Sequence, residues 1–232
     1  MRAAATVLLL SAHALAHAQN ATITGIFPTI DLGVDLTERW SANAYLFDAI
    51  KTGDDGSLNA RIPGGSFYGY VELGITRHLG DRLSATAAYV REQQFPFEPT
   101  ARIEHRLFQQ LTLKGQRGRM DAKLRLRFDE RWIRAHDEAS SIFNSRLRLL
   151  GGMKWPNDTR AYLTGYFEGF LTTTGDLSHD ETWATAQLGL KLGGVHAVEA
   201  GLLYIDWRMP YGWLHQYYAQ VTWVMSINMR NQ

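Results

Sequence analysis

Apolar and polar residues alternate along most of this chain with a period of two, and charged residues occupy the polar positions even at the centres of the alternating runs. The clearest run spans residues 121–132, where apolar residues take the even positions, apart from Glu130, and charged residues take the odd ones. Successive side chains of a β-strand point to opposite faces. The spacing therefore predicts strands with one apolar face and one charged face.

Composition removes several other classes of protein. Of the 232 residues, 45% are hydrophobic, yet no apolar run after Ala18 reaches the length of about eighteen residues that a membrane-spanning helix requires. The absence of cysteine excludes thiolate metal sites and disulfide frameworks. Without Arg2 the chain has 23 basic and 23 acidic residues, and this neutrality argues against a nucleic-acid partner.

The N-terminus has the pattern of a secretory signal peptide. Arg2 supplies a positive charge, an apolar stretch begins at Ala3, and Ala16-His17-Ala18 has small residues at the cleavage positions. We therefore predict a signal peptide over 1–18 and a single β-barrel domain over 19–232. The alternative is a short N-terminal helix buried in a core.

Three observations favour a barrel whose apolar face contacts lipid and whose charged face is enclosed. The apolar faces include many small residues, such as Ala85 and Gly165, which pack a soluble core poorly. The charged faces carry nearly matched numbers of acids and bases, which suggests pairing inside. Aromatic residues gather near strand ends, as in the girdles of outer-membrane barrels: Trp40, Phe67, Tyr89, Trp132, Trp155, Trp213 and Trp223.

We accordingly expect an all-β, transmembrane, antiparallel up-and-down β-barrel in the bacterial outer membrane. Its partners would be outer-membrane lipid and the barrel-assembly machinery. A soluble lipocalin-like barrel is the alternative, because period two alone does not say which face points inward.

The number of strands follows less directly. Besides 121–132, alternating runs lie at 30–36, 40–46, 67–76, 83–89, 102–112, 146–155, 161–171, 183–192, 198–204 and 213–225. They make eleven strands, whereas bacterial barrels of this class have an even number. Either Asn20 to Ile26 forms a further strand, giving twelve, or Ile30 to Leu36 lies outside the wall, giving ten. We expect about twelve.

The connections should alternate in length, as they do in outer-membrane barrels. Short ones are expected near Thr37, Gly80, 115–118, 156–158 and 193–194, and longer ones near 49–64, 94–100, 134–143, 173–181 and 206–212. Three polar residues interrupt apolar faces, namely His105, Gln109 and Glu130. We expect each to lie near a membrane interface or at a β-bulge.

Four segments in order carry a resemblance to a known family. They are 104–110 (EHRLFQQ), 127–131 (RFDER), 146–148 (RLR) and 166–170 (YFEGF). Over nearly the whole mature chain the sequence resembles the uncharacterised bacterial family called domain of unknown function 2490. The resemblance implies an outer-membrane barrel and no assigned activity. The chain departs from the family at Thr185, ahead of Gly189, where Asn-Arg is usual.

The charged faces predict a network inside the barrel, with possible anion binding because guanidinium groups suit carboxylates and phosphates. Its expected members are Glu104, Arg106, Arg125, Arg127, Asp129, Arg131, Arg146, Arg148 and Glu168. We favour a structural role, because buried charges persist mainly when they are paired.

No spacing reproduces a catalytic motif, so we predict no catalytic, metal or cofactor-binding residues. The histidines considered are His215, His179 beside Asp180, and His136 with Ser140 and Ser141 nearby. The expected function is non-enzymatic, structural or weakly pore-forming. The alternatives are a lipid-modifying hydrolase at the barrel rim and a secreted soluble carrier.

Overall fold

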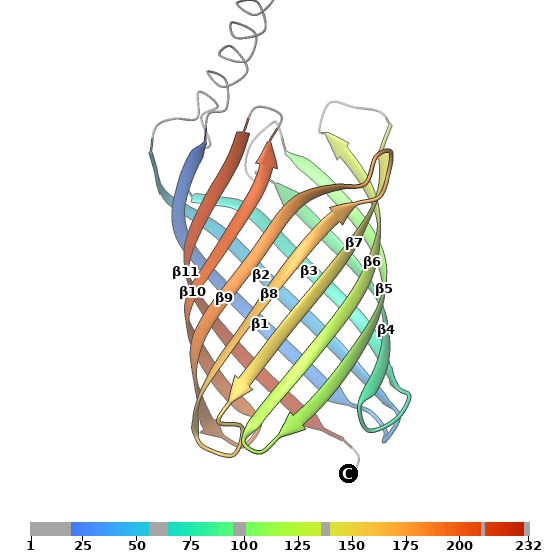
Figure 1. The fold of residues 1–232 in the computed structure, drawn as a ribbon, viewed down its shortest axis with the longest axis vertical. Helices are drawn as coiled ribbons and strands as arrows, with labels where there is room; N and C mark the ends of the chain where they lie inside the picture. Colours follow the sequence, from blue (N-terminus) through green and yellow to red (C-terminus); the bar gives the residue numbers. More distant parts are fainter. Residues whose placement is uncertain (1–19, 56–64, 95–100, 136–139, 210–211, 230–232) are drawn as a thin grey trace, which may run out of the picture.

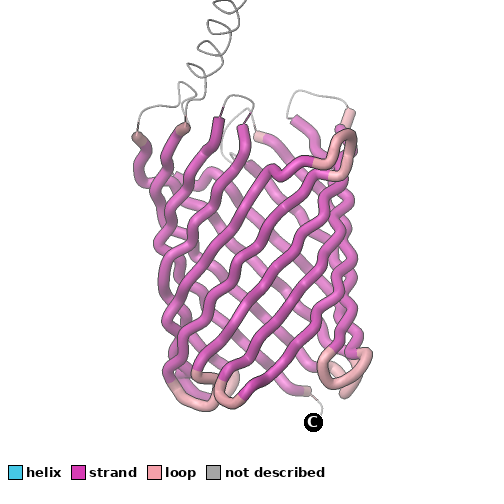
Figure 2. The backbone as a smooth tube through the Cα atoms, in the orientation of Figure 1, coloured by secondary structure: helices cyan, strands magenta, loops and turns pink. Residues whose placement is uncertain are grey.

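The computed structural model describes residues 20–55, 65–94, 101–135, 140–209 and 212–229, and these residues form a closed β-barrel (Figures 1 and 2). The strands are β1 (Ala21–Asp35), β2 (Trp40–Asp54), β3 (Gly65–His78), β4 (Leu83–Gln94), β5 (Arg102–Arg117), β6 (Met120–Ala135), β7 (Ile142–Trp155), β8 (Ala161–Thr172), β9 (Ser178–Gly193), β10 (His196–Met209) and β11 (Gly212–Asn228). The described residues include no helix that is long and apolar enough to cross a membrane.

The prediction of an all-β barrel is confirmed, with eleven strands where about twelve were expected. The two candidate segments at the start of the chain, 20–26 and 30–36, are parts of one continuous strand, β1. Pro28, which interrupts the alternation in the sequence, lies within this strand, opposite Val221 of β11. Neighbouring strands pair antiparallel except at the closure, where β1 pairs with β11 in parallel from Ala21–Leu214 to Asp35–Asn228.

The connections differ in length at the two ends of the barrel. One end, here called the short-turn end, has connections of two to five residues: 36–39, 79–82, 118–119, 156–160 and 194–195. The opposite, long-loop end has connections of two to ten residues: 55–64, 95–101, 136–141, 173–177 and 210–211. The expected asymmetry is therefore present, but the long connection predicted at 206–212 is wrong, because Met209 and Gly212 pair directly.

Local chemistry explains the short turns. Gly118 and Gly194 have φ angles of +57° and +55°, a region that favours glycine, and each begins a two-residue turn. Arg119 in the β5–β6 turn donates from Nε to Asp158 Oδ1 in the β7–β8 turn at 2.9 Å. This hydrogen bond lowers the pKa of the Asp158 carboxyl. The turns thus tie neighbouring hairpins together.

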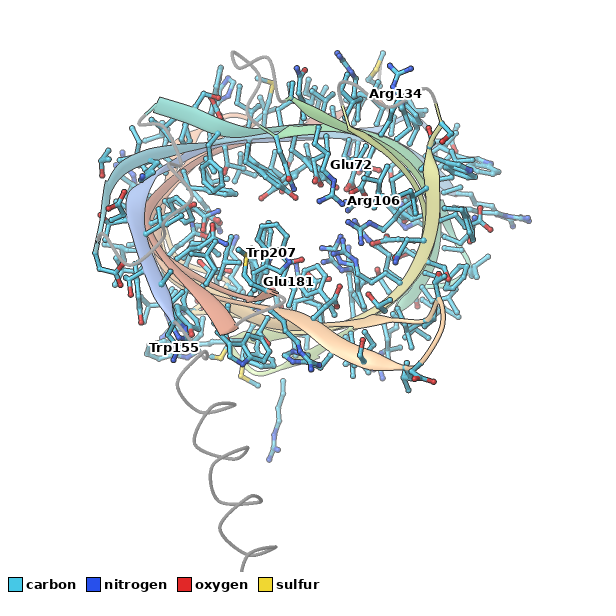
Figure 3. The ribbon with its side chains drawn as sticks, turned by 90° about the horizontal axis from the view of Figure 1, so that it is seen from above. Glu72, Arg106, Arg134, Trp155, Glu181 and Trp207 are labelled. Atoms are coloured by element: carbon cyan, nitrogen blue, oxygen red, sulfur yellow. The ribbon has the colours of Figure 1, made fainter. Side chains whose placement is uncertain are left out.

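The wall has its apolar side outward, as expected. Leu124, Leu126 and Leu149 are 50%, 45% and 53% exposed on the outer surface, whereas Arg127, on the opposite face of the same strand as Leu126, is 4% exposed. Viewed down the barrel, Arg106 and Glu72 point into the lumen, while Arg134 and Trp155 lie outside the ring of strands (Figure 3). The period-two pattern therefore sorts side chains between lumen and exterior.

Two expectations about the wall are wrong. Phe67 is buried inside the barrel and does not belong to an outer girdle. A bulge shifts the β2–β3 register, which passes from Ala49–Tyr68 directly to Ile50–Ser66, and this shift changes the face to which Phe67 points. Gln109 lies midway along β5, where neither adjoining register shifts. Its neutral amide costs less to place on an apolar face than a charge would. His105 lies near the long-loop end of β5, hydrogen-bonded to Tyr89 at 2.6 Å.

The interior is only partly charged, which the sequence pattern did not indicate. Buried aromatic and aliphatic side chains form a cluster contributed mainly by β1, β2, β3, β9, β10 and β11, with Phe27, Phe47 and Trp183 at its centre. Phe27 stacks on Phe47 at 4.4 Å, and both rings contact Trp183 at 6.0 Å. Smaller barrels can be filled entirely by side chains, and here rings fill one side of the lumen.

Glycine makes room for one of the rings. A Cβ atom at Gly189 would lie 2.2 Å from ring atoms of Tyr162, its direct partner on β8. Tyr162 cannot easily move away, because it donates to Glu199 at 2.8 Å and lies under Lys154 Nζ at 3.6 Å. The Tyr162 ring therefore covers a position that must lack a side chain.

We expect Gly189→Ala to destabilise the barrel by about 1–3 kcal/mol, the usual cost of overpacking. Urea unfolding of the refolded protein measures the change. Gly33→Ala, in β1, is the matched control, since a Cβ there meets no atom within 4 Å. Equal effects of the two substitutions would contradict this account of the packing.

Candidate functional site in the barrel lumen

The candidate site is a network of charged side chains that β3 to β9 direct into the lumen. Each member occupies a lumen-facing position of the alternation, so neighbouring members on one strand are two residues apart. Arg106 and Glu104 on β5, and Arg127 and Asp129 on β6, are all at most 4% exposed. Full burial of so many charges requires that each meets an opposite charge or a hydrogen-bonding group.

Arg106 lies at the first centre of the network. Its guanidinium donates to Glu104 Oε1 at 2.6 and 2.9 Å and to Glu92 Oε2 at 2.8 Å. Arg131 also binds Glu104, with one donor on each carboxylate oxygen at 2.6 and 2.7 Å. Two arginines and two glutamates of β4, β5 and β6 thus form one group, in which bidentate geometry adds strength and orientation.

Asp129 is the second centre. Its Oδ2 atom lies 3.3 Å from Arg146, 3.6 Å from Arg148 and 3.8 Å from Arg106, and the residue is 0% exposed. Arg146 continues across the lumen to Glu181 of β9 at 2.9 Å. One carboxylate therefore links the groups of β5 and β7.

Two more carboxylates hold the remaining arginines. Glu168 of β8 accepts from Arg148 at 2.9 Å through both oxygens and from Arg125 at 2.7 Å. Glu72 of β3 accepts from Arg127 of β6 at 3.1 Å. Strands β3 and β6 are not neighbours, so this pair spans the lumen. Backbone pairing joins adjacent strands, and the side-chain network joins distant ones.

Two cavities lie within the lumen. The lower cavity, of about 450 Å³, extends to the short-turn end, and the upper cavity, of about 260 Å³, extends toward the long-loop end. Four residues line both and so lie between them: Tyr68, Arg146, Glu181 and Trp183. Glu181 joins this layer together, because it binds Arg146 and accepts from Trp183 Nε1 at 2.5 Å. Figure 3 shows Glu181 on the opposite side of the lumen from Arg106 and Glu72.

The structure brings all nine predicted network residues together in the lumen. It adds Glu72 and Glu92, whose charges the pattern places on the enclosed faces but which were not among the nine, and Glu181, which the pattern did not place there. Glu72 occupies a polar position of the run 67–76, Glu92 continues the polar positions of the run 83–89, and Glu181 shares the parity of Trp183. Extending each run by a few residues at its long-loop end could have found the last two.

The histidines considered for catalysis lie in different places. His215 is within β11 on the outer wall, and its Nδ1 atom lies 2.9 Å from Tyr204 Oη and 3.0 Å from Asp206 Oδ1. His179 lies 2.8 Å from Thr182 Oγ1. His136 falls outside the described residues. Across the described part of the chain, no three acidic or histidine side chains gather in a way that could hold a metal ion.

Comparison with known proteins gives a family but no activity. No curated protein and no solved structure matches the chain. Residues 24–213 match a family described as protein of unknown function (DUF2490), and this match begins in β1 and ends in β11. The chain belongs to that family of proteins of unknown function, DUF2490.

Proposed function

We propose that this protein is an outer-membrane β-barrel whose lumen is held closed by its ion network, and that its role is structural and not that of an open diffusion pore. The observation that carries the proposal is the layer of Arg146, Glu181, Trp183 and Tyr68 between the two lumen cavities. A solute crossing the barrel would have to separate the buried Arg146–Glu181 ion pair in this layer.

The outer wall supports the membrane part of the proposal. On β7, Phe143 and Trp155 are 49% and 48% exposed at opposite ends of the outward face, with Leu149 and Met153 between them. The twelve residue-to-residue steps from Phe143 to Trp155, at about 3.4 Å each and tilted by about 40°, span about 30 Å, which is close to the hydrocarbon thickness of a bilayer. In water, the side chains of this apolar band would be exposed to solvent at a cost in free energy, whereas lipid would cover them.

The network supports the closed lumen. The Arg146–Glu181 pair spans from β7 to β9, and the Arg127–Glu72 pair spans from β6 to β3. Removing one partner of a buried pair leaves an uncompensated charge at a cost of about 3–5 kcal/mol. Thermal motion at ordinary temperature therefore opens the layer rarely.

Cell fractionation tests the membrane assignment. We expect the native protein in the outer-membrane fraction, and we expect Leu126→Arg to reduce its folded amount there severalfold. The reason is that an arginine on the lipid face near mid-wall costs about 2–4 kcal/mol. Leu79→Arg, in an exposed turn, is the matched control and should behave as native. Recovery of the native protein in the soluble periplasm would refute the assignment and favour a soluble carrier.

Conductance in planar bilayers tests the closed lumen. The native barrel should show at most small, rare current steps. The double variant Arg146→Ala/Glu181→Ala removes one positive and one negative group from the dividing layer and should conduct severalfold more. Arg119→Ala/Asp158→Ala removes an exposed pair at the turns and should leave the current unchanged. An open native pore, or a double variant that conducts no more than native, would contradict the proposal.

The structural role of the network has its own test. Asp129→Asn leaves Arg106, Arg146 and Arg148 facing a neutral amide, so we expect a loss of about 3–5 kcal/mol in unfolding free energy. The adjacent Glu130→Gln makes the same chemical change on the outward face and should not destabilise the barrel. Urea unfolding in lipid vesicles compares the two, and equal stability of both variants would show that the network adds little.

A further inference from the structure

Two lysines face each other in the lumen near the short-turn end. Lys114 of β5 and Lys123 of β6 are direct partners in the β5–β6 register, and both line the lower cavity. Side chains at directly opposed positions start about 5 Å apart, and like charges there repel. An antiparallel pair normally avoids such an arrangement, so the lysine pair calls for an explanation.

The arginines that line this cavity form close ion pairs, whereas the two lysines do not; Asp31 and Glu168 attract Lys123 from a longer distance. Arg125 binds Glu168 at 2.7 Å, and Arg127 binds Glu72 at 3.1 Å. Within the described residues, neither Lys114 nor Lys123 forms an ion pair or a side-chain hydrogen bond. Both side chains stay exposed because they face the cavity.

The backbone leaves space beside this pair. Gly152 of β7 lies opposite Lys123, and a Cβ atom at Gly152 would be 3.0 Å from Lys123 Cε. The lysine stem therefore lies against a position without a side chain. Thr112, two residues before Lys114 on the same face, and Ser84 also line the cavity and offer hydroxyl groups.

Basic side chains outnumber acidic ones in the lining of the lower cavity. The lining includes seven lysine and arginine side chains but five acidic ones. Two of the acids come from the opposite side of the barrel, namely Asp31 of β1 and Glu199 of β10. Glu199 accepts a hydrogen bond from Tyr162 at 2.8 Å, and neither acid lies within ion-pair distance of the two lysines. The lining arginines are paired, in part with Glu92, Glu104 and Asp129, which do not line the cavity. Among the described lining residues, the two lysines on one side and the two acids on the other are therefore the charged groups left outside these ion pairs.

We propose that the lower cavity binds a small solute bearing a phosphate or carboxylate group, held between Lys114 and Lys123. Arg125, adjacent on the same face of β6, provides further positive charge. A bound oxyanion would convert the repulsion between the lysines into two attractive contacts, each charge-assisted. The volume of about 450 Å³ limits the ligand to a small molecule. Ser41, His78 and Ser84, at the short-turn ends of their strands, line the cavity and mark the side of entry.

This proposal concerns the lumen alone and holds whether or not the barrel lies in a membrane or conducts ions. It can therefore be tested with the whole barrel refolded in detergent. Inorganic phosphate and succinate are titrated separately, at constant ionic strength set with chloride, and calorimetry measures binding. The absence of lipid in this assay separates a free anion from a lipid headgroup as the source of the charge.

We expect saturable binding of at least one of the two anions and a rise in the unfolding midpoint when it is bound. Lys114→Gln/Lys123→Gln should weaken this binding at least tenfold, and without anion it should unfold no earlier than native because the repulsion is gone. Lys114→Arg/Lys123→Arg should retain binding. Arg119→Gln, which removes an exposed cation at the same end, should bind as native does.

Three results would overturn the proposal. The first is that native protein binds neither phosphate nor succinate. The second is that the double glutamine variant binds with unchanged affinity. The third concerns Asp31, which faces the lysines across the cavity. Asp31→Asn should keep or strengthen anion binding. If Asp31→Asn instead destabilises the barrel, and this loss of stability disappears when Lys123 is also replaced, then Asp31 neutralises the lysine pair.

Discussion

The pairing of guanidinium groups with enclosed carboxylates is the interaction on which the rest of the interior depends. Asp129 has no exposed surface, and one of its oxygens lies within 4 Å of Arg106, Arg146 and Arg148. An isolated charge at this place would be prohibitively costly, so all three arginines must be present in the correct register. Register in turn fixes which face of each strand points outward, since a shift by one residue would exchange the faces. The lumen charges and the apolar wall are therefore two results of one alignment.

The sequence predicted the charged half of the barrel well. Strands β5, β6 and β7 have faces of clearly different polarity, so their orientation, and the nine network residues on them and on β8, followed from spacing. The other half was harder, because Leu202 faces outward and Leu203 inward, and both are apolar. Where both faces of a strand are apolar, the alternation does not show which face points inward. The sequence therefore did not predict the aromatic cluster around Phe47.

Other misses have local causes. Phe67 lies inside because one bulge changes its parity, and a bulge cannot be read from a regular run of residues. The expected strand count rested on treating 20–26 and 30–36 as separate segments, whereas β1 runs continuously through both. Lys123 was recognised as a lumen residue, but its pairing with Lys114 required the register of the β5–β6 hairpin.

The parallel pairing of β1 with β11 has a consequence for assembly. Every other junction in the wall joins consecutive strands, so it can form as a hairpin soon after both strands are present. The seam joins Ala21 to Leu214, residues almost the full length of the wall apart in sequence. Contacts of such long range form slowly, and until they form both edge strands expose unpaired backbone groups. We therefore expect closure to be the last step of folding, and the open sheet that precedes it to be the species most prone to aggregate or to be captured by a chaperone.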